Sequence, residues 1–302
     1  MLGSITALLL AAIPSEAKGA VTTTITGSGN VFQALVLGLV QGITEFLPIS
    51  STAHLLVATK ILGWESLGSK DYVDAIQFGS VIAVYIYFWK DITSLLKGGI
   101  AGILKQDWEN QDVKILAGIA VGTLPALIIG FLFKDALDDT VGIIGVMSIV
   151  MATLLFLAER YGTRKRGFNR LEIKDGLLVG LAQTIALLPG ASRSGSTLTA
   201  GLFLGLERET AARFSFLVGL PVLTIATLYK SLKIFQAFQA HLLPDNILLL
   251  LIVGIASTFI FSYISIAFLL NYLKTKDTII FVWYRYAFGV SLLVALAMGW
   301  KA

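Results

Sequence analysis

The chain has 302 residues; 56% of them are hydrophobic, only 14% are charged, none is cysteine and two are histidine. A soluble domain of this length carries more charge on its surface. The lack of cysteine excludes disulfides, thiol nucleophiles and cysteine metal sites, and two histidines nearly exclude a site that needs two or three of them. The net charge of +4 is modest and reflects lysines and arginines in loops, so no nucleic-acid partner is expected.

The first 30 residues differ from the rest of the chain. MLGSITALLLAAIPSEAKGA resembles the apolar core of a signal peptide but lacks the basic residues that normally precede such a core. The polar stretch VTTTITGSGN that follows has the composition of a linker. We interpret residues 1–30 as an extension, either a weak targeting segment or a short extra helix. Residues 31–302 are then a single integral membrane domain.

Ten apolar segments follow, and we expect helices because every backbone amide in lipid must be paired within its own segment. About six are predicted to be full spans: residues 73–89, 114–134, 140–159, 211–230, 246–270 and 279–300. The other four form two pairs, each interrupted at a proline: 31–47 with 51–62, and 173–188 with 195–206. A helix of about 12 residues covers about 18 Å and cannot cross a core of about 30 Å. Each pair is therefore predicted to be a re-entrant hairpin.

The two predicted hairpins resemble each other in sequence. GLVQ at residues 38–41 matches GLAQ at 180–183, and the Leu-Pro pairs at 47–48 and 188–189 are each followed by a cluster of serines. Chance similarity between Gly- and Leu-rich stretches is the alternative. Because the Gln, Pro and Ser matches are in register, we interpret the chain as an internal duplication.

Three full spans lie between the hairpins, and this odd number makes the hairpins open from opposite sides of the membrane. The two repeats, about 31–159 and 173–302, then have inverted topology, and the hairpins are expected to meet near the bilayer midplane. One side holds 14 lysines and arginines and the other holds seven, so the first side is predicted to be cytoplasmic. The loops on the cytoplasmic side are 90–114, 160–174, 207–213 and 271–277. The first hairpin, both termini and the 231–245 loop then face outward.

The first hairpin carries polar side chains at membrane depth. Gln41 and Glu45 share one helix face, and a carboxylate inside a membrane indicates function, with a structural hydrogen-bonded acid as the alternative. The hydroxyls of Ser50, Ser51 and Thr52 stand where the second half-helix begins. They can cap that helix, and the N-terminal amides of such a helix attract phosphate.

A histidine follows these hydroxyls on the same half-helix. His54 is three residues after Ser51 and four after Ser50, so it can reach a hydroxyl on its own helical face. This arrangement supplies a nucleophile and a base, or the histidine itself attacks. A satisfied buried histidine is the alternative.

The second hairpin contains an arginine among hydroxyls, in the stretch GASRSGST. Arg193 at membrane depth needs a negative partner, and with Ser192, Ser194 and the helix start loosened by Gly195 it forms a phosphate-binding set. The alternative is that Arg193 only pairs with Glu45 to hold the halves together.

Three other polar residues lie on the predicted spans. Arg285, about seven residues into the last one, is either a second anion contact or a snorkelling side chain. Asp74 and Gln77 either line the outward mouth of the site or form a polar helix entrance.

The motifs GITEFLPISSTAH and PGASRSGST, with WYRYAFG near the C-terminus, resemble those of the undecaprenyl-diphosphate phosphatase family, also called UppP or BacA, over roughly residues 31–300. The resemblance implies a multi-pass enzyme of the bacterial inner membrane. Such an enzyme hydrolyses the lipid undecaprenyl diphosphate to the monophosphate and inorganic phosphate. This recycles the lipid carrier for cell-wall peptidoglycan synthesis and gives bacitracin resistance. The resemblance also implies a divalent cation, Mg²⁺ or Ca²⁺.

Carried over by motif, the expected catalytic residues are Glu45, Ser51, His54 and Arg193, with Glu45 also the metal ligand. The expected substrate-binding residues are Gln41, Ser50, Thr52, Ser192, Ser194, Gly195 and Arg285. The chain departs from the family pattern at Gln41, where many members have Glu, and at Ala53, where glycine is common. The first departure removes one metal carboxylate.

Several alternatives stay open at the level of sequence. Either Ser51 or His54 is the nucleophile. A type-2 lipid phosphatase needs two histidines in separate motifs, and His241 stands in a polar loop without one. A lipid transporter or flippase would also have inverted repeats with broken helices, although a carrier needs no nucleophile. A monomer can hold the whole site, and a homodimer is left open.

Overall fold

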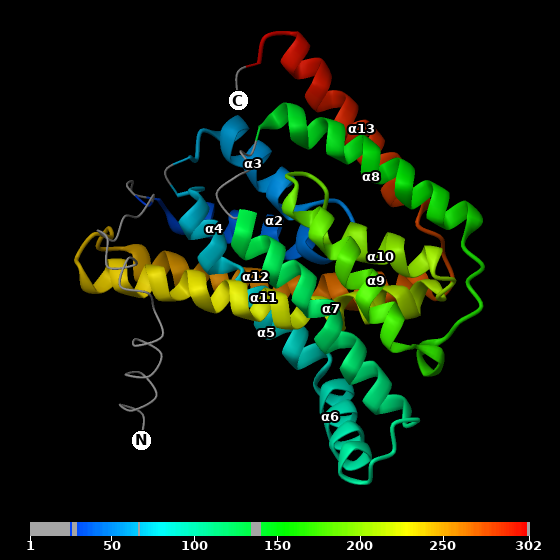
Figure 1. The fold of residues 1–302 in the computed structure, drawn as a ribbon. Helices are drawn as coiled ribbons and strands as arrows, with labels where there is room; N and C mark the ends of the chain where they lie inside the picture. Colours follow the sequence, from blue (N-terminus) through cyan, green and yellow to red (C-terminus); the bar gives the residue numbers. More distant parts are fainter. Residues whose placement is uncertain (1–24, 26–28, 66, 134–139, 301–302) are drawn as a thin grey trace.

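The computed structural model describes residues 25, 29–65, 67–133 and 140–300, and this part of the chain is all-α, with one isolated β-bridge and no strand (Figure 1). Nearly all of the predicted extension, residues 1–30, lies outside the described residues. The α-helices are α2 (Val31–Phe46), α3 (Ser51–Leu62), α4 (Lys70–Ile76), α5 (Phe78–Tyr87), α6 (Trp89–Leu104), α7 (Gln111–Phe133), α8 (Val141–Tyr161), α9 (Ile173–Thr184), α10 (Arg193–Phe203), α11 (Arg208–Gln239), α12 (Ile247–Leu273) and α13 (Ile279–Ala297). Two 3₁₀ turns, η2 (Phe168–Arg170) and η3 (Ile185–Leu187), flank α9.

Five of the described helices are long and apolar enough to cross a membrane: α7, α8, α11, α12 and α13. The helical stretch Lys70–Tyr87 and α6 meet at an angle of 64° and make a sixth span if they are counted together. Large apolar side chains such as Ile128, Ile252 and Val294 are exposed on these helices, as expected of surfaces that face lipid. The predicted class, a multi-pass all-α membrane protein with about six spans, is confirmed.

Two segments that we predicted to be loops are largely helical. Residues 90–114 contain most of α6, and α11 extends to Gln239, well into the predicted 231–245 loop. Lysines at positions 90 and 230 ended the charge-free runs that located the spans. Scattered charges do not stop a helix whose other faces are apolar, so the loop boundaries drawn from these runs were wrong.

Two pairs of short helices, α2 with α3 and α9 with α10, stand where the sequence predicts hairpins. The residue before α3 is Ser50 and the residue before α10 is Ser192, and their φ angles are 76° and 72°. A positive φ is uncommon for residues other than glycine. Both turns thus share one unusual backbone shape, as a duplication would produce.

The hairpins are held by close helix packing at glycines. α2 packs along α12, and a Cβ on Gly38 would lie 2.6 Å from the carbonyl oxygen of Gly254. α9 packs along α7, and a Cβ on Gly180 would overlap the backbone of Gly122. Small residues permit such approach between membrane helices. Each hairpin is thereby fixed against a long helix from the other half of the chain.

Candidate active site

The turns of the two hairpins meet at a cavity of about 250 Å³. Both hairpins line it, together with parts of α7 and α11 and the junction of α4 with α5. Six of the predicted site residues lie in its wall: Glu45, Ser50, Ser51, Thr52, Ser192 and Arg193. The structure therefore brings together side chains that are more than 140 residues apart in sequence.

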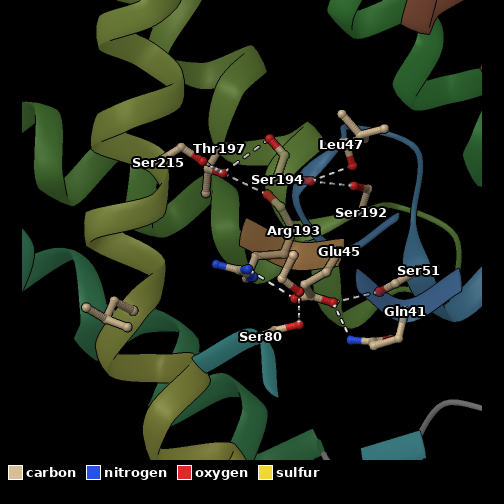
Figure 2. A network of polar contacts seen from close by, with 12 residues as sticks. Gln41, Glu45, Leu47, Ser51, Ser80, Ser192, Arg193, Ser194, Thr197 and Ser215 are labelled. Carbon is tan, nitrogen blue, oxygen red and sulfur yellow. Dashed lines mark hydrogen bonds and ion pairs between the residues drawn. The ribbon is translucent and has the colours of Figure 1, made fainter. Parts of the chain in front are cut away.

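Glu45 is the centre of the polar contacts in this cavity (Figure 2). Its Oε1 accepts a hydrogen bond from Nη2 of Arg193 at 3.0 Å. Its Oε2 accepts from Nε2 of Gln41 at 3.0 Å and from Oγ of Ser51 at 2.8 Å. Glu45 is only 7% exposed, and these partners offset the cost of burying its carboxylate. A serine hydroxyl that donates to a carboxylate is an arrangement from which a base can activate a nucleophile.

Three residues of the second motif build its turn. The Oγ of Ser192 accepts from the backbone N–H of Gly195 and so caps α10. The Oγ of Ser194 donates to the carbonyl oxygen of Leu47 at 2.9 Å, which joins the two hairpins directly (Figure 2). Ser194 and Gly195 are not in the cavity wall. Their contacts are structural, whereas Ser192 and Arg193 face the cavity.

His54 does not pair with Ser51. Its Nδ1 donates to the carbonyl oxygen of Ser50 at 2.7 Å, and its Nε2 lies 2.6 Å from the hydroxyl of Tyr284. The imidazole stacks on the ring of Phe288 and lies nearly parallel to the ring of Tyr284, both on α13, and the residue is absent from the cavity wall. The helical spacing put His54 within reach of a hydroxyl, but its rotamer points toward α13 instead.

Arg285 is buried, so it does not snorkel, and it is not in the wall of the described cavity. It is 1% exposed, and its guanidinium donates to the carbonyl oxygens of Pro48 at 3.0 Å and Gly190 at 2.8 Å, one in each hairpin turn. It also donates to carbonyl oxygens of Met147, Ser148 and Ala191. An arginine can serve as a multiple donor to backbone, and here it fixes the two turns against each other and against α8.

Two polar residues in the cavity wall, Gln183 and Lys230, were given no role from the sequence. Gln183 was noted only as a match to Gln41, and Lys230 was only counted among the seven basic residues of the outward side. The Nζ of Lys230 lies 2.6 Å from Oδ1 of Asp74. Gln77 lines the same cavity as Lys230, whereas Asp74 is outside its wall. The equivalence of Gln183 to Gln41 was the sequence signal for the first residue. Nothing in the sequence marked Lys230, because the pairing depends on how α11 packs against α4.

The cavity offers one carboxylate to a metal ion. Among the described residues there is no group of three or more acidic, histidine or cysteine side chains placed to hold a metal, and Glu45 is the acid in the described cavity wall. Mg²⁺ commonly binds through one or two carboxylates together with substrate phosphates and water. The donor set therefore fits a cation shared with a phosphorylated substrate, rather than one held entirely by protein.

The fold and the site define the class of this protein: a multi-pass helical membrane protein with a cavity lined by hydroxyls, one carboxylate, one arginine and one lysine. The sequence profile of the family described as bacitracin resistance protein BacA matches residues 34–291. The chain belongs to this family.

Proteins named undecaprenyl-diphosphatase are similar over most of their length. The one from Thermosynechococcus vestitus is 52% identical over 269 residues, which cover 88% of this chain and 96% of the relative. The one from Trichormus variabilis is 49% identical over 277 residues, 89% of this chain and 85% of the relative. The one from Synechocystis sp. is 47% identical over 297 residues, 95% of this chain and 89% of the relative.

Proposed function

We propose that the chain hydrolyses undecaprenyl diphosphate to undecaprenyl phosphate and inorganic phosphate, the activity named for its relatives. The observation that carries the proposal is the hydrogen bond from Ser51 to Glu45 in a cavity that also holds Arg193. A hydroxyl nucleophile, a base and a cation for the phosphate are the groups that phosphate transfer needs. A carrier would need only the last of these. The reaction would return the lipid carrier to cell-wall synthesis and account for bacitracin resistance.

In the proposed reaction, the Oγ of Ser51 attacks the terminal phosphorus while its proton passes to Oε2 of Glu45. The bond from that phosphorus to the bridging oxygen breaks, and undecaprenyl phosphate leaves. Water then attacks the phosphoserine, releases inorganic phosphate and restores the hydroxyl. Arg193 binds the phosphate oxygens and balances the charge that develops on them. His54 orients the turn through its bond to Ser50 and is a positioning residue in this scheme.

The charges in the cavity favour a divalent cation as cofactor. Glu45 is balanced by Arg193, and Lys230 by Asp74, so the protein supplies little net positive charge to a diphosphate. Mg²⁺ or Ca²⁺ held by Glu45 and the phosphates would supply it. Its chemistry there is to neutralise the phosphate oxygens and so favour attack.

The cavity is proposed to open to the outer face of the bacterial inner membrane. Its lining residues on α11 run from Val222, near the middle of the helix, to Lys230, in the half away from Arg208. The basic residues Lys165, Arg170 and Arg213 line a separate cavity of about 690 Å³. Lys165 and Arg170 precede α9 and Arg213 is near the start of α11, on the side that the positive-inside rule makes cytoplasmic. The repeats are proposed to be inverted, which puts the diphosphate near the midplane and its isoprenoid tail in lipid.

The test is phosphate release from undecaprenyl diphosphate by the purified full chain in detergent, with and without EDTA. We expect release that stops with EDTA and resumes with Mg²⁺ or Ca²⁺. Ser51→Ala should release no phosphate, whereas Ser291→Ala, an exposed serine on α13, should match the wild type. A folded wild-type protein that binds the lipid but releases no phosphate would contradict the proposed hydrolysis and favour the transporter interpretation.

A further inference from the structure

A buried carboxamide in the cavity wall lacks hydrogen-bond partners. Gln183, in the last turn of α9, is only 3% exposed. Neither its Nε2 nor its Oε1 has a partner among the described residues. Burial of an unpaired amide costs stability, and most buried polar groups in native proteins are paired. The carboxamide is therefore placed for something other than the packing of α9.

The matching residue of the first hairpin shows what is missing. Gln41 donates from Nε2 to Oε2 of Glu45, the residue four positions later on the same helix face. Four positions after Gln183 stands Leu187, whose side chain has no hydrogen-bond acceptor. The second hairpin thus keeps the amide donor without the carboxylate. An anionic ligand in the cavity would bring the negative charge that this position lacks.

A second observation places Gln183 beside the phosphate-binding arginine. A Cβ on Gly219 would overlap Nη1 of Arg193 and lie 3.2 Å from Oε1 of Gln183. Both side chains therefore converge on the same small patch of α11, and glycine provides the room. Within the described part of the chain, the hydrogen bond of Arg193 to Glu45 uses Nη2. Nη1 and the carboxamide lie together without a described partner.

We propose that Gln183 contacts the substrate: its Nε2 donates to an anionic phosphate oxygen that Nη1 of Arg193 also binds. The identity of that phosphate, as part of undecaprenyl diphosphate, rests on the proposed function. The anion site itself rests on the two side chains and the cavity. Gln183 and Arg193 then form one oxyanion clamp on the second hairpin, opposite Ser51 and Glu45 on the first.

The proposal predicts opposite effects on stability and on binding. Gln183→Leu removes the unpaired amide from the protein without ligand, so its melting temperature should equal or exceed that of the wild type. The same change removes a hydrogen bond to a charged ligand, so KM for undecaprenyl diphosphate and the inhibition constant of pyrophosphate should each rise at least about tenfold. Gln183→Glu should weaken the binding of undecaprenyl diphosphate and of pyrophosphate further, because it places a negative charge next to an anionic ligand. Gln239→Leu, an exposed position at the end of α11, is the matched control.

Pyrophosphate binding by calorimetry separates this proposal from the proposed function. The wild type could release no phosphate but bind pyrophosphate, with Gln183→Leu losing that binding and Gln239→Leu keeping it. That result would support the oxyanion clamp and contradict the proposed hydrolysis. A folded Gln183→Leu protein with wild-type KM and wild-type pyrophosphate affinity would overturn the clamp. So would a lowered melting temperature with unchanged affinity, which is the signature of a packing role. Gln183→Met, which keeps the length without the donor, replaces the leucine variant if that variant does not fold.

Discussion

Oε1 of Glu45 lies 3.0 Å from Nη2 of Arg193, although 148 residues separate them in the chain. Each charge comes from a different hairpin, and their side chains are only 5% and 15% exposed. Removal of one member leaves the other charge buried and unpaired, which is costly. The pair therefore joins the two halves of the protein at the point where phosphate is proposed to bind.

Arg193 should not be replaceable by lysine. A lysine keeps the charge but lacks the planar fork that binds Glu45 and phosphate oxygens at the same time. We expect Arg193→Lys to lower kcat/KM for undecaprenyl diphosphate by about 100-fold with little change in the melting temperature. Arg193→Ala should lose activity and stability together. A lysine variant with wild-type kcat/KM would show that only the charge matters.

His54 should act by position and not by proton transfer. His54→Ala removes the bond to the carbonyl oxygen of Ser50 and should lower kcat by releasing the turn that holds Ser51. In His54→Asn the amide nitrogen can take the place of Nδ1. Its kcat should be at least about tenfold higher than that of His54→Ala, which corresponds to roughly one hydrogen bond. A base or nucleophile could not be rescued in this way, so equal inactivity of the two variants would restore the histidine to a catalytic role.

Arg285 should be required for folding. Arg285→Met keeps much of the volume but leaves the carbonyl oxygens of Pro48 and Gly190 without their donor. With several buried acceptors unpaired, the free energy of unfolding should fall by more than about 3 kcal/mol. Thermal unfolding in detergent measures this loss, with Lys301→Met at the C-terminus as the control. An equally stable Arg285→Met protein would contradict the structural role.

Glu159 should stabilise the end of the protein remote from the cavity. It is 6% exposed and accepts hydrogen bonds from Arg164, from Arg208 and from both the backbone N–H and the hydroxyl of Thr278. Glu159→Ala leaves two cations unpaired and should lower the free energy of unfolding by about 3–5 kcal/mol. KM for the lipid should stay unchanged in the fraction that folds. A large change in KM without a change in stability would be unexpected.

Much of the fold could be predicted because it depends on local composition. The charge-free runs located the long helices, and prolines at 48 and 189 located the two hairpins. Helix α6 and the C-terminal part of α11 were missed for the same reason: a lysine ended each charge-free run while the chain remained helical.

The sequence predicted many residues of the candidate site but not the hydrogen bonds between them. Spacing put Gln41 and Glu45 on one face, and in the structure the two side chains are hydrogen-bonded. Spacing also gave His54 a hydroxyl within reach, yet it could not decide the rotamer, which depends on Tyr284 and Phe288 from a helix 230 residues later.

The sequence by itself determined the class of protein, the two hairpins and the residue types that meet in the cavity, because hydrophobicity, proline and intramembrane charge act over a few residues. Tertiary structure alone decided that Arg285 binds backbone carbonyls, that His54 faces α13, and that Gln183 lies unpaired beside Arg193. These outcomes depend on which helix faces touch across the membrane domain. That choice is made by close packing at glycines and by buried polar pairs between distant segments.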